Sequence, residues 1–334
     1  MIAQLNKHYL RLSLFKTWQR LVAYFLFEGR PLTTKGQWFN PMVRAWLKCA
    51  IAVSKPALKY PPVFIIGTGR SGTTLLGLLL SMHKNIAFLN EPKMLWHLAN
   101  RADDVIGSYN HTGGTFLLNA YDSTPLVIAK IRKAYSAFLK MTSGKIVLDK
   151  YPEIVFRTGY VEKIFPECKF LFITRNFSDT VLSNEQWNKT NAKKNNSKRE
   201  DWWGFNNKKW KLICAELLPE SKLLKDYSGE IINLEDDILK SAVEWIVTME
   251  KGLSLLKSQK NILHIKYEDL IEETETTLVN VLNFLNLRTD ERINNYAKAV
   301  LKKNFSKQVE LVMPDFLTKA AAEISMQLNY KPLK

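Results

Sequence analysis

The sequence predicts an α/β protein built on a doubly wound parallel sheet. Short apolar runs, which suit strands buried on both faces, alternate along the chain with longer helical segments. The first run, Val63 to Ile66, follows two prolines and leads into a glycine-rich turn and an apolar helix. Strand, turn and helix in this order are typical of a P-loop-like phosphate-binding loop. We divide the chain into a basic helical N-terminal extension, residues 1–60, and a main domain, residues 61–334.

The same reading predicts the other elements in order. Strands are expected at 63–66, 86–89, 145–148, 169–174 and 262–265. Helices are expected at about 4–27, 41–54, 73–83, 93–101, 124–141, 153–165, 179–188, 236–258, 274–302 and 314–328. The polar and basic residues 189–209 are expected to form a surface loop, and loops of such length often act as lids.

The charge of the chain is strongly positive and unevenly distributed. Lysine and arginine total 48 against 32 acidic residues, which gives a net charge of +16 and favours anionic partners. Residues 1–60 hold ten of the cations and a single acid, Glu28. Aromatic residues are interspersed with these cations. The segment is therefore either a helical layer packed on the main domain, which is the commoner use of amphipathic helices, or an anchor at a membrane surface.

Composition excludes several classes of protein. A hydrophobic fraction of 46% and a charged fraction of 24% are those of a globular chain, not of a disordered, collagenous or coiled-coil one. The three widely spaced cysteines predict neither a disulfide framework nor a zinc site. No apolar run approaches the roughly 18 residues of a membrane-spanning helix. We therefore expect a cytoplasmic protein, with residues 1–60 as the candidate for peripheral membrane contact.

The strongest local pattern is Gly-Thr-Gly-Arg-Ser-Gly-Thr-Thr, residues 67–74. Glycines let the backbone turn and bring N–H groups close to an anion, and the start of the following helix adds a partial positive charge. The glycine spacing fits the Walker pattern, but Thr73 stands where nucleotide hydrolysis needs lysine, and Arg70 supplies a cation from within the loop. A P-loop kinase or NTPase stays open as an alternative, as does a basic nucleic-acid- or membrane-binding protein with a vestigial loop.

At these residues the chain resembles a known family. Val63 to Leu80 is similar to the 5′-phosphosulfate loop of sulfotransferases that use 3′-phosphoadenosine 5′-phosphosulfate (PAPS), and further motifs match in family order over about residues 61–330. The resemblance implies that Arg175, at the end of a strand, and Ser183, on the next helix, bind the 3′-phosphate. The geometry of a helix agrees, because its side chains tilt toward its N-terminus, where an arginine fork can hold an anion.

Two further segments extend the resemblance. Ile265 to Leu270 is similar to the end of the last sheet strand in many sulfotransferases, which implies cofactor contact for Tyr267. Core packing, with a helix cap at Glu268 or Asp269, is the alternative. Asn304 to Lys307 resembles a phosphosulfate-holding segment of tyrosylprotein sulfotransferases. The donor-binding residues implied by the resemblance are Gly69, Arg70, Ser71, Gly72, Thr73, Thr74, Arg175, Ser183, Tyr267, Ser306 and Lys307.

The resemblance also implies the reacting groups. Sulfuryl transfer needs a base for the acceptor proton and cations at the phosphosulfate oxygens. Glu91, in Leu-Asn-Glu-Pro after the second strand, matches the catalytic position of the glutamate-base branch, which resembles tyrosylprotein and carbohydrate sulfotransferases. Lys150, in Asp-Lys-Tyr-Pro, matches a lysine that donates to the leaving oxygen, and Arg70 would share this role. A helix cap and a surface lysine are the respective alternatives.

The expected function is therefore in-line transfer of a sulfuryl group from PAPS to a hydroxyl or an amine. Lysine and arginine can neutralise the charge, so no metal is expected. The sequence does not define the acceptor, which is a carbohydrate, a protein tyrosine, a lipid or a small molecule. No nucleic-acid partner is expected.

Overall fold

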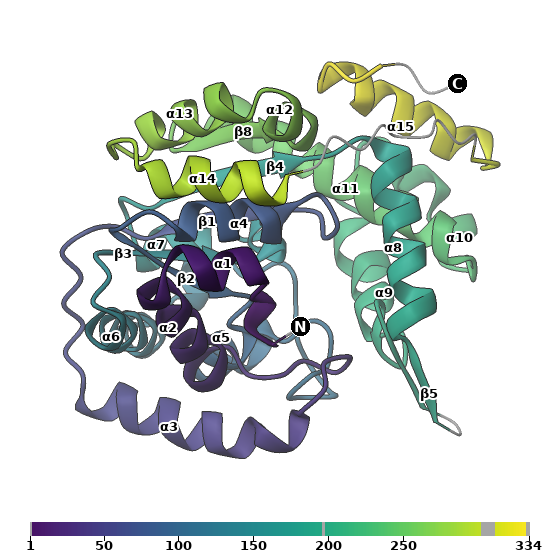
Figure 1. Ribbon diagram of the computed structural model, residues 1–334. Coiled ribbons are helices and arrows are strands. Elements are labelled where there is room, and N and C mark those ends of the chain that lie inside the picture. Colours follow the sequence, from purple (N-terminus) through teal and green to yellow (C-terminus); the bar gives the residue numbers. More distant parts are fainter. Residues whose placement is uncertain (1, 196–197, 302–310, 332–334) are drawn as a thin grey trace.

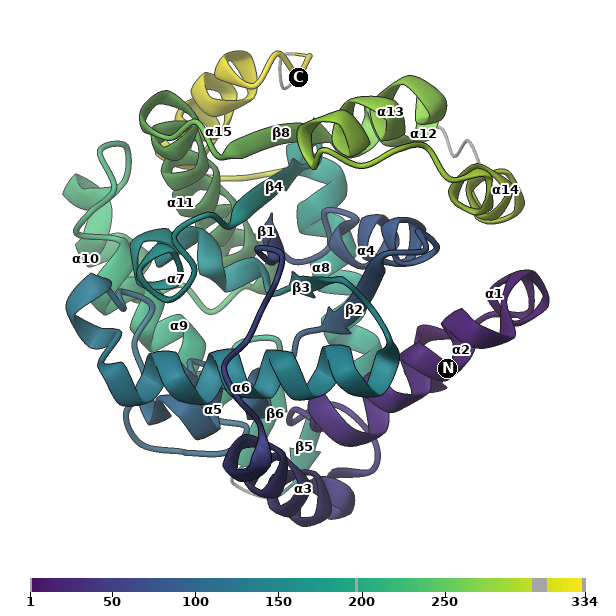
Figure 2. The ribbon, with the colours of Figure 1, turned by 90° about the vertical axis from the view of Figure 1, so that its left-hand side faces the viewer.

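A five-stranded parallel sheet forms the centre of the molecule, with the strand order β2-β3-β1-β4-β8 (Figure 1). The structure is a computed structural model that describes residues 2–195, 198–301 and 311–331. The chain winds outward from β1 in both directions and helices cover both faces (Figure 2), so the predicted fold class is confirmed. The strands are β1 (Val63–Gly67), β2 (Ile86–Asn90), β3 (Ile146–Lys150), β4 (Lys169–Thr174) and β8 (Ile262–Lys266).

Burial explains why these strands could be recognised. Every residue of β1 and β3 is buried, and β2 and β4 are buried except at one end, so each strand contains a run of three or more apolar residues. Register then determines what meets at the carboxyl edge. Lys150 on β3 pairs with Ile65 of β1 on one side and with Asn90 of β2 on the other. The residue after β2, Glu91, therefore emerges beside Lys150.

Two layers of helices bury the sheet. Phe64 and Ile66 belong to a core cluster shared with α6, α7 and α11, while Val63 and Ile65 face a second cluster shared with α4, α13 and α14. The helices are α1 (Lys7–Leu12), α2 (Leu14–Val22), α3 (Asn40–Val53), α4 (Thr73–Ser81), α5 (Lys93–Ala99), α6 (Pro125–Thr142), α7 (Thr158–Ile164), α8 (Phe177–Asn191), α9 (Lys208–Leu212), α10 (Ser228–Ile231), α11 (Asp237–Ser258), α12 (Tyr267–Glu272), α13 (Thr274–Phe284), α14 (Glu291–Val300) and α15 (Asp315–Gln327).

The prediction of a surface loop at residues 189–209 is wrong. The segment forms a small antiparallel sheet of β5 (Lys193–Asn195), β6 (Lys198–Asp201) and β7 (Gly204–Phe205), which follows α8 directly. Its turn depends on Gly204, whose φ of +80° favours glycine. The buried ring of Trp203 lies 5.6 Å from that of Trp210 and ties the small sheet to α9. The charged and amide residues of β5 and β6 have low β propensity, and β7 has only two residues, so the sequence did not indicate these strands.

Several predicted helices are divided in the structure. The segment 4–27 separates into α1 and α2 at Ser13, whose extended backbone caps α2, and it ends in a π turn, Ala23–Phe27. The segment 153–165 becomes a 3₁₀ turn, Pro152–Phe156, followed by α7. The apolar residues keep the spacing of a helix across these breaks. The hydrophobic pattern therefore predicted the helices but not where they end.

Residues 2–60 form a helical layer against the β2 edge of the sheet. Lys16 donates to the carbonyl of Ile86 (2.8 Å), and Arg20 donates to the carbonyl of Phe88 (2.9 Å) and to Glu28 (2.6 Å). These side chains are buried, so three charges of the segment serve packing. The boundary at residue 60 stays a prediction. Within the described ranges, no helix combines the length and the apolar character that crossing a bilayer requires.

Candidate active site

The glycine-rich turn joins β1 to α4 and has the conformation that the sequence predicted. Gly67 and Gly72 adopt φ values of +141° and +86°, and a Cβ at Gly67 would lie 2.4 Å from the carbonyl oxygen of Ile173. Arg70 also has a positive φ, +68°, which costs a residue with a side chain about 1 kcal/mol. Ser71 bonds through its hydroxyl to Thr68, and both side chains are buried. The turn thus stores strain while directing the Arg70 side chain outward.

Four predicted donor-binding residues meet around this turn, although they come from four segments. Arg70 donates from Nε to the hydroxyl of Ser183 on α8 (3.2 Å). Arg175, just after β4, donates to the carbonyl of Arg70 (3.2 Å), and its guanidinium lies 4.6 Å from the ring centroid of Tyr267. A Cβ at Gly72 would lie 2.3 Å from the same ring. Desolvation, and then the nearby Arg175, lower the pKa of Arg70. Two neighbouring guanidinium groups of this kind favour an anion.

Two contacts position Arg175. The indole of Trp245 donates to its carbonyl (3.2 Å), and the backbone N–H of Asn176 donates to the carboxylate of Glu268 (2.9 Å). Tyr330 in turn donates to Glu268 (3.0 Å). The sequence had suggested Glu268 only as a helix cap and had assigned no role to Trp245, because each acts on the backbone beside Arg175.

Glu91 and Lys150 form an ion pair at the carboxyl edge of the sheet. The backbone N–H of Glu91 donates to the carbonyl of Lys150 (2.8 Å), and the Lys150 ammonium donates to the Glu91 carboxylate. The side chain of Lys150 is only 3% exposed, whereas that of Glu91 is 31% exposed. Burial would raise the pKa of Glu91, but Lys150 and Lys93 outweigh it and lower this pKa to about 2. Glu91 is therefore ionised, and neither residue is an isolated surface group.

A second pair, which sequence reasoning missed, continues the row of charges. The Lys93 ammonium lies 3.4 Å from the Glu91 carboxylate and 2.7 Å from that of Glu153. Burial favours the neutral amine, yet Glu153 and Glu91 outweigh this and raise the pKa of Lys93. The signal was available only in part: Lys93 follows Glu91 by two residues, and Glu153 follows Lys150 by three.

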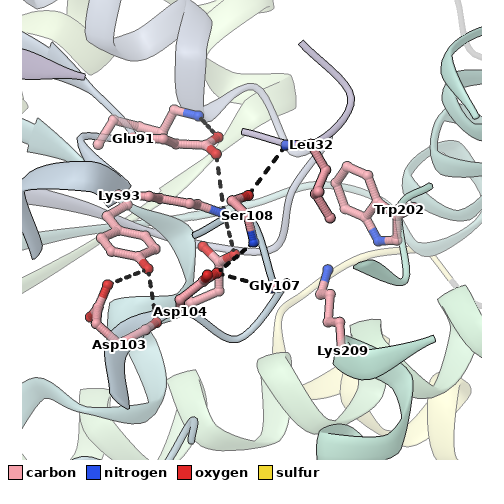
Figure 3. Close-up of polar contacts among 12 residues, drawn as sticks. Leu32, Glu91, Lys93, Asp103, Asp104, Gly107, Ser108, Trp202 and Lys209 are labelled. Carbon is pink, nitrogen blue, oxygen red and sulfur yellow. Dashed lines mark hydrogen bonds and ion pairs between the residues drawn. The ribbon is translucent and has the colours of Figure 1, made fainter. Parts of the chain in front are cut away.

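These groups line one cavity of about 480 Å³ (Figure 3). Trp202 and Lys209 form the wall across from Glu91 and Lys93. The Trp202 indole donates to Glu244 (2.6 Å), and the Lys209 ammonium lies 4.4 Å from its ring and 2.5 Å from the Glu244 carboxylate. The lining includes Gly67, Gly69, Arg70, Thr73, Thr74, Glu91, Lys93, Lys150, Glu153, Trp202, Lys209 and Glu244.

Trp202 lies directly against the phosphate loop. A Cβ at Gly69 would lie 2.3 Å from its ring, so glycine is needed there for this close approach. Trp202 reaches this position because the small sheet of β5 to β7 carries it, and the backbone of Phe205 in that sheet donates to the carbonyl of Ile106, another lining residue (2.9 Å). The carboxylate of Asp104 accepts from the backbone N–H groups of residues 107–110, which fixes the loop around Ile106.

The predicted residues thus divide into three sets. Glu91, Lys150, Arg70, Gly69, Thr73 and Thr74 line the cavity. Ser71, Gly72, Arg175, Ser183 and Tyr267 lie in the turn or contact it from beyond the lining. Ser306 and Lys307 lie outside the described residues. Among the residues that the structure describes, no group of three or more His, Cys, Asp or Glu side chains is arranged to hold a metal ion.

A strained glycine-rich turn and a lysine–carboxylate pair with a buried lysine lie at one edge of a parallel sheet, which is where ligands bind in open α/β folds. A family model described as the sulfotransferase family matches residues 61–220. Over these residues the chain is similar to the sulfotransferase family, in agreement with the resemblance found in the sequence.

Individual relatives are distant. Nodulation protein NoeE of Sinorhizobium fredii is 28% identical over 123 residues, which are 34% of this chain and 28% of that protein, so the match spans less than a third of the relative's length. The sulfotransferase domain from the curacin biosynthetic pathway has a TM-score of 0.50 at 14% identity, covering 83% of this chain and 100% of that one. Sulfotransferase STF9 from Mycobacterium avium has a TM-score of 0.51 at 11% identity, covering 88% and 83%. These two likenesses show a shared fold.

Proposed function

We propose that this chain transfers a sulfuryl group from PAPS to a hydroxyl or amine of an acceptor, with Glu91 as the base. One observation carries the proposal: the Glu91–Lys150 pair and the phosphate loop line the same cavity. A base and a cation are thereby available beside a site built for an anion, which is what sulfuryl transfer requires.

The residues around the loop fit an anionic donor with two phosphate groups. Residues 69–74 form a turn at the start of α4, where backbone N–H groups and the helix terminus favour the 5′-phosphosulfate. Arg175 and Ser183 are assigned to the 3′-phosphate, and both lie within hydrogen-bond distance of Arg70. Tyr267 supports Arg175 through its ring. Arg70 then lies between the two phosphate sites and can serve either.

Glu91 as found is a poor base, because its pKa of about 2 reflects its pairing with lysine. The pairing itself suggests how it is activated. If Lys150 turns to the bridging oxygen of the donor, Glu91 loses its closest cation and its pKa rises. Glu91 then accepts the acceptor's proton while the bond from acceptor to sulfur forms and the sulfur–oxygen bond to the phosphate breaks. Lys150 stabilises the charge left on the oxygen of adenosine 3′,5′-bisphosphate.

Lys93 has a different task in this proposal. It stays paired with Glu153, which fixes its ammonium 3.4 Å from Glu91 when Lys150 leaves. A single remaining cation orients the carboxylate without neutralising it completely. Lys93 is therefore a positioning residue.

The donor is tested first, by thermal shift with adenosine 3′,5′-bisphosphate, ATP and an oligonucleotide. A ligand at 100 times its dissociation constant stabilises a protein by about 2.7 kcal/mol, so selective binding gives a clear shift. We expect the bisphosphate to be preferred. A larger shift with ATP would favour the kinase alternative, and one with the oligonucleotide would favour nucleic-acid binding.

The reaction is tested with ³⁵S-labelled PAPS and a panel of acceptors: carbohydrates, tyrosine peptides, lipids and small phenols or amines. Transfer to one class identifies the acceptor, and Lys150→Ala is the matched inactive variant. Strong bisphosphate binding without transfer to any class, and without PAPS hydrolysis, would contradict the proposed reaction while leaving the nucleotide site intact.

A further inference from the structure

An exposed apolar stripe runs along α2 and its terminal π turn. Leu14, Phe15, Trp18 and Phe25 recur at the spacing of one helix face, and the exposed fractions of Leu14 and Trp18 are 81% and 43%. The opposite face of α2 is buried and holds Lys16 and Arg20 against the sheet edge. The helix is therefore inverted relative to ordinary surface helices, with cations inside and large apolar side chains outside.

A second stripe on α3 joins the first. Met42, Trp46 and Val53 lie four and then seven residues apart, and Trp38 precedes them with 79% of its surface exposed. The ring of Phe39 connects the stripes, since its centroid is 5.9 Å from that of Phe25 and 5.7 Å from that of Trp38. In both ribbon views α3 lies at the periphery of the molecule (Figures 1 and 2). We name this surface the N-terminal face, made of Leu14, Phe15, Trp18, Phe25, Trp38, Met42, Trp46 and Val53.

The exposed charges of residues 1–60, the segment that carries the N-terminal face, are of one sign. The single acid of residues 1–60, Glu28, is buried against Arg20. Lys16, Arg20 and Arg30 are buried too. Seven cations remain at least partly exposed: Lys7, Arg11, Lys35, Arg44, Lys48, Lys55 and Lys59. The outer surface of the segment thus combines apolar and aromatic side chains with positive charge alone.

We propose that the N-terminal face docks on an anionic phospholipid bilayer. Tryptophan and phenylalanine suit the boundary between headgroups and acyl chains, and lysine and arginine are attracted to anionic lipid. A second copy of the chain fits less well, because both copies carry a net charge of +16. Nucleic acid would satisfy the cations but leave the aliphatic side chains, Leu14, Met42 and Val53, without apolar contact.

Docking is separable from the proposed reaction. The eight side chains of the N-terminal face are absent from the described lining of the cavity, so their replacement leaves Glu91, Lys150 and Arg70 untouched. The same segment does reach the cavity by other residues, Tyr24 and residues 31–34. A docked enzyme therefore has its cavity wall and its membrane contact on one continuous segment.

The test is flotation of the full chain with vesicles of phosphatidylcholine alone or with 30 mol% phosphatidylglycerol. Two variants probe the apolar and the charged parts: Trp18→Ser with Trp38→Ser, and Lys48→Glu with Lys55→Glu. Matched controls lie elsewhere: Tyr121→Ser, at a tyrosine that is 95% exposed, and Lys251→Glu with Lys257→Glu, on the exposed side of α11. Thermal unfolding verifies that each variant folds.

We expect binding to the anionic vesicles that weakens at high salt, and a loss of about tenfold or more in the partition coefficient for both test variants. The controls should bind like the unmodified chain, and tryptophan emission should shift to the blue on binding and be quenched by brominated lipid. Three results would overturn the proposal: no binding to anionic vesicles, equal binding by the test variants, or a dimer in solution that the tryptophan variant loses.

Discussion

The two ends of the active-site cavity hold their cations in opposite electrostatic settings. At the glycine-rich turn, Arg70 contacts Ser183 and Arg175, and the carboxylate of Asp179 lies 3.9 Å from the Arg175 guanidinium. Beside β2 and β3, Lys150 and Lys93 each lie in direct contact with a glutamate. In the first arrangement the carboxylate lies beyond hydrogen-bond distance of Arg175, so the two guanidinium groups can still bind an added anion. In the second arrangement the lysines and glutamates balance each other in charge. In the proposed reaction, Lys150 exchanges its contact with Glu91 for one with the leaving oxygen.

The largest expected effect on turnover is the loss of Glu91, the internal partner that we propose as the base. Glu91→Gln keeps the size and much of the hydrogen bonding of the side chain, but it cannot take the acceptor proton. We expect turnover to fall by about 10² or more, with little change in the affinity for adenosine 3′,5′-bisphosphate. Steady-state kinetics and nucleotide titration measure the two quantities. Near-normal turnover on the true acceptor would remove Glu91 from this role.

Lys150→Ala is also expected to lower turnover by about 10² or more, but for a different reason: charge on the leaving oxygen is no longer stabilised. Acceptors of graded acidity separate the two variants, because an acidic acceptor needs less help from a base. Such an acceptor should restore Glu91→Gln and leave Lys150→Ala impaired. Equal rescue of both variants would show that the two residues do not divide the work as proposed.

A neighbouring carboxylate sharpens the comparison, because it is buried without a cation in contact. Asp149 precedes Lys150 on β3 and accepts hydrogen bonds from Trp96 (2.9 Å) and from Tyr135. Burial raises its pKa to about 7, although these hydrogen bonds oppose the rise. Glu91, one strand away and paired with lysine, has a pKa of about 2. The partner, more than the depth of burial, decides the protonation state.

The stability of the protein should record this difference. Since the folded state keeps the Asp149 proton to about pH 7 while the unfolded state releases it near pH 4, this residue makes stability fall as the pH rises from 4 to 7. The contribution is on the order of 4 kcal/mol. Asp149→Asn should remove it, so the stability of the unmodified chain relative to the variant should decline over this range. Urea unfolding at several pH values measures this, and parallel curves would contradict it.

Much of the fold could be predicted from the sequence because the strands are buried on both faces. Runs such as Phe170 to Ile173 have no polar side to confuse the pattern. Candidate site residues could be predicted from the sequence where they directly follow a strand, as Glu91 follows β2. The register of parallel strands brings such residues to one edge of the sheet. Arg70 could be placed because glycines surround it.

Other features depended on contacts that no local pattern encodes. Lys93 meets Glu153 only because the turns after β2 and β3 approach each other. Trp202 reaches Gly69 by way of a small sheet whose strands are polar. The count of cations in residues 1–60 did not indicate which of them are buried. Lys16 and Arg20 are buried because backbone carbonyls at the sheet edge accept their hydrogen bonds. In each case tertiary structure supplied the partner.

The smallest expected effect tests the end of the cavity that awaits an anion. Arg175→Ala should weaken binding of adenosine 3′,5′-bisphosphate by about 2 kcal/mol, roughly 30-fold, because one charge-assisted contact to the 3′-phosphate is lost. Adenosine 5′-phosphate, which lacks that phosphate, should be affected much less. Lys189→Ala is the control, since Lys189 lies on the same helix as Ser183 but pairs with Glu185 at the surface (2.7 Å). Isothermal titration with both nucleotides gives the four comparisons. An equal loss of affinity for both nucleotides would mean that Arg175 does not select the 3′-phosphate but supports the turn through its hydrogen bond to the Arg70 carbonyl. The two ends of the cavity would then differ less than their contacts suggest.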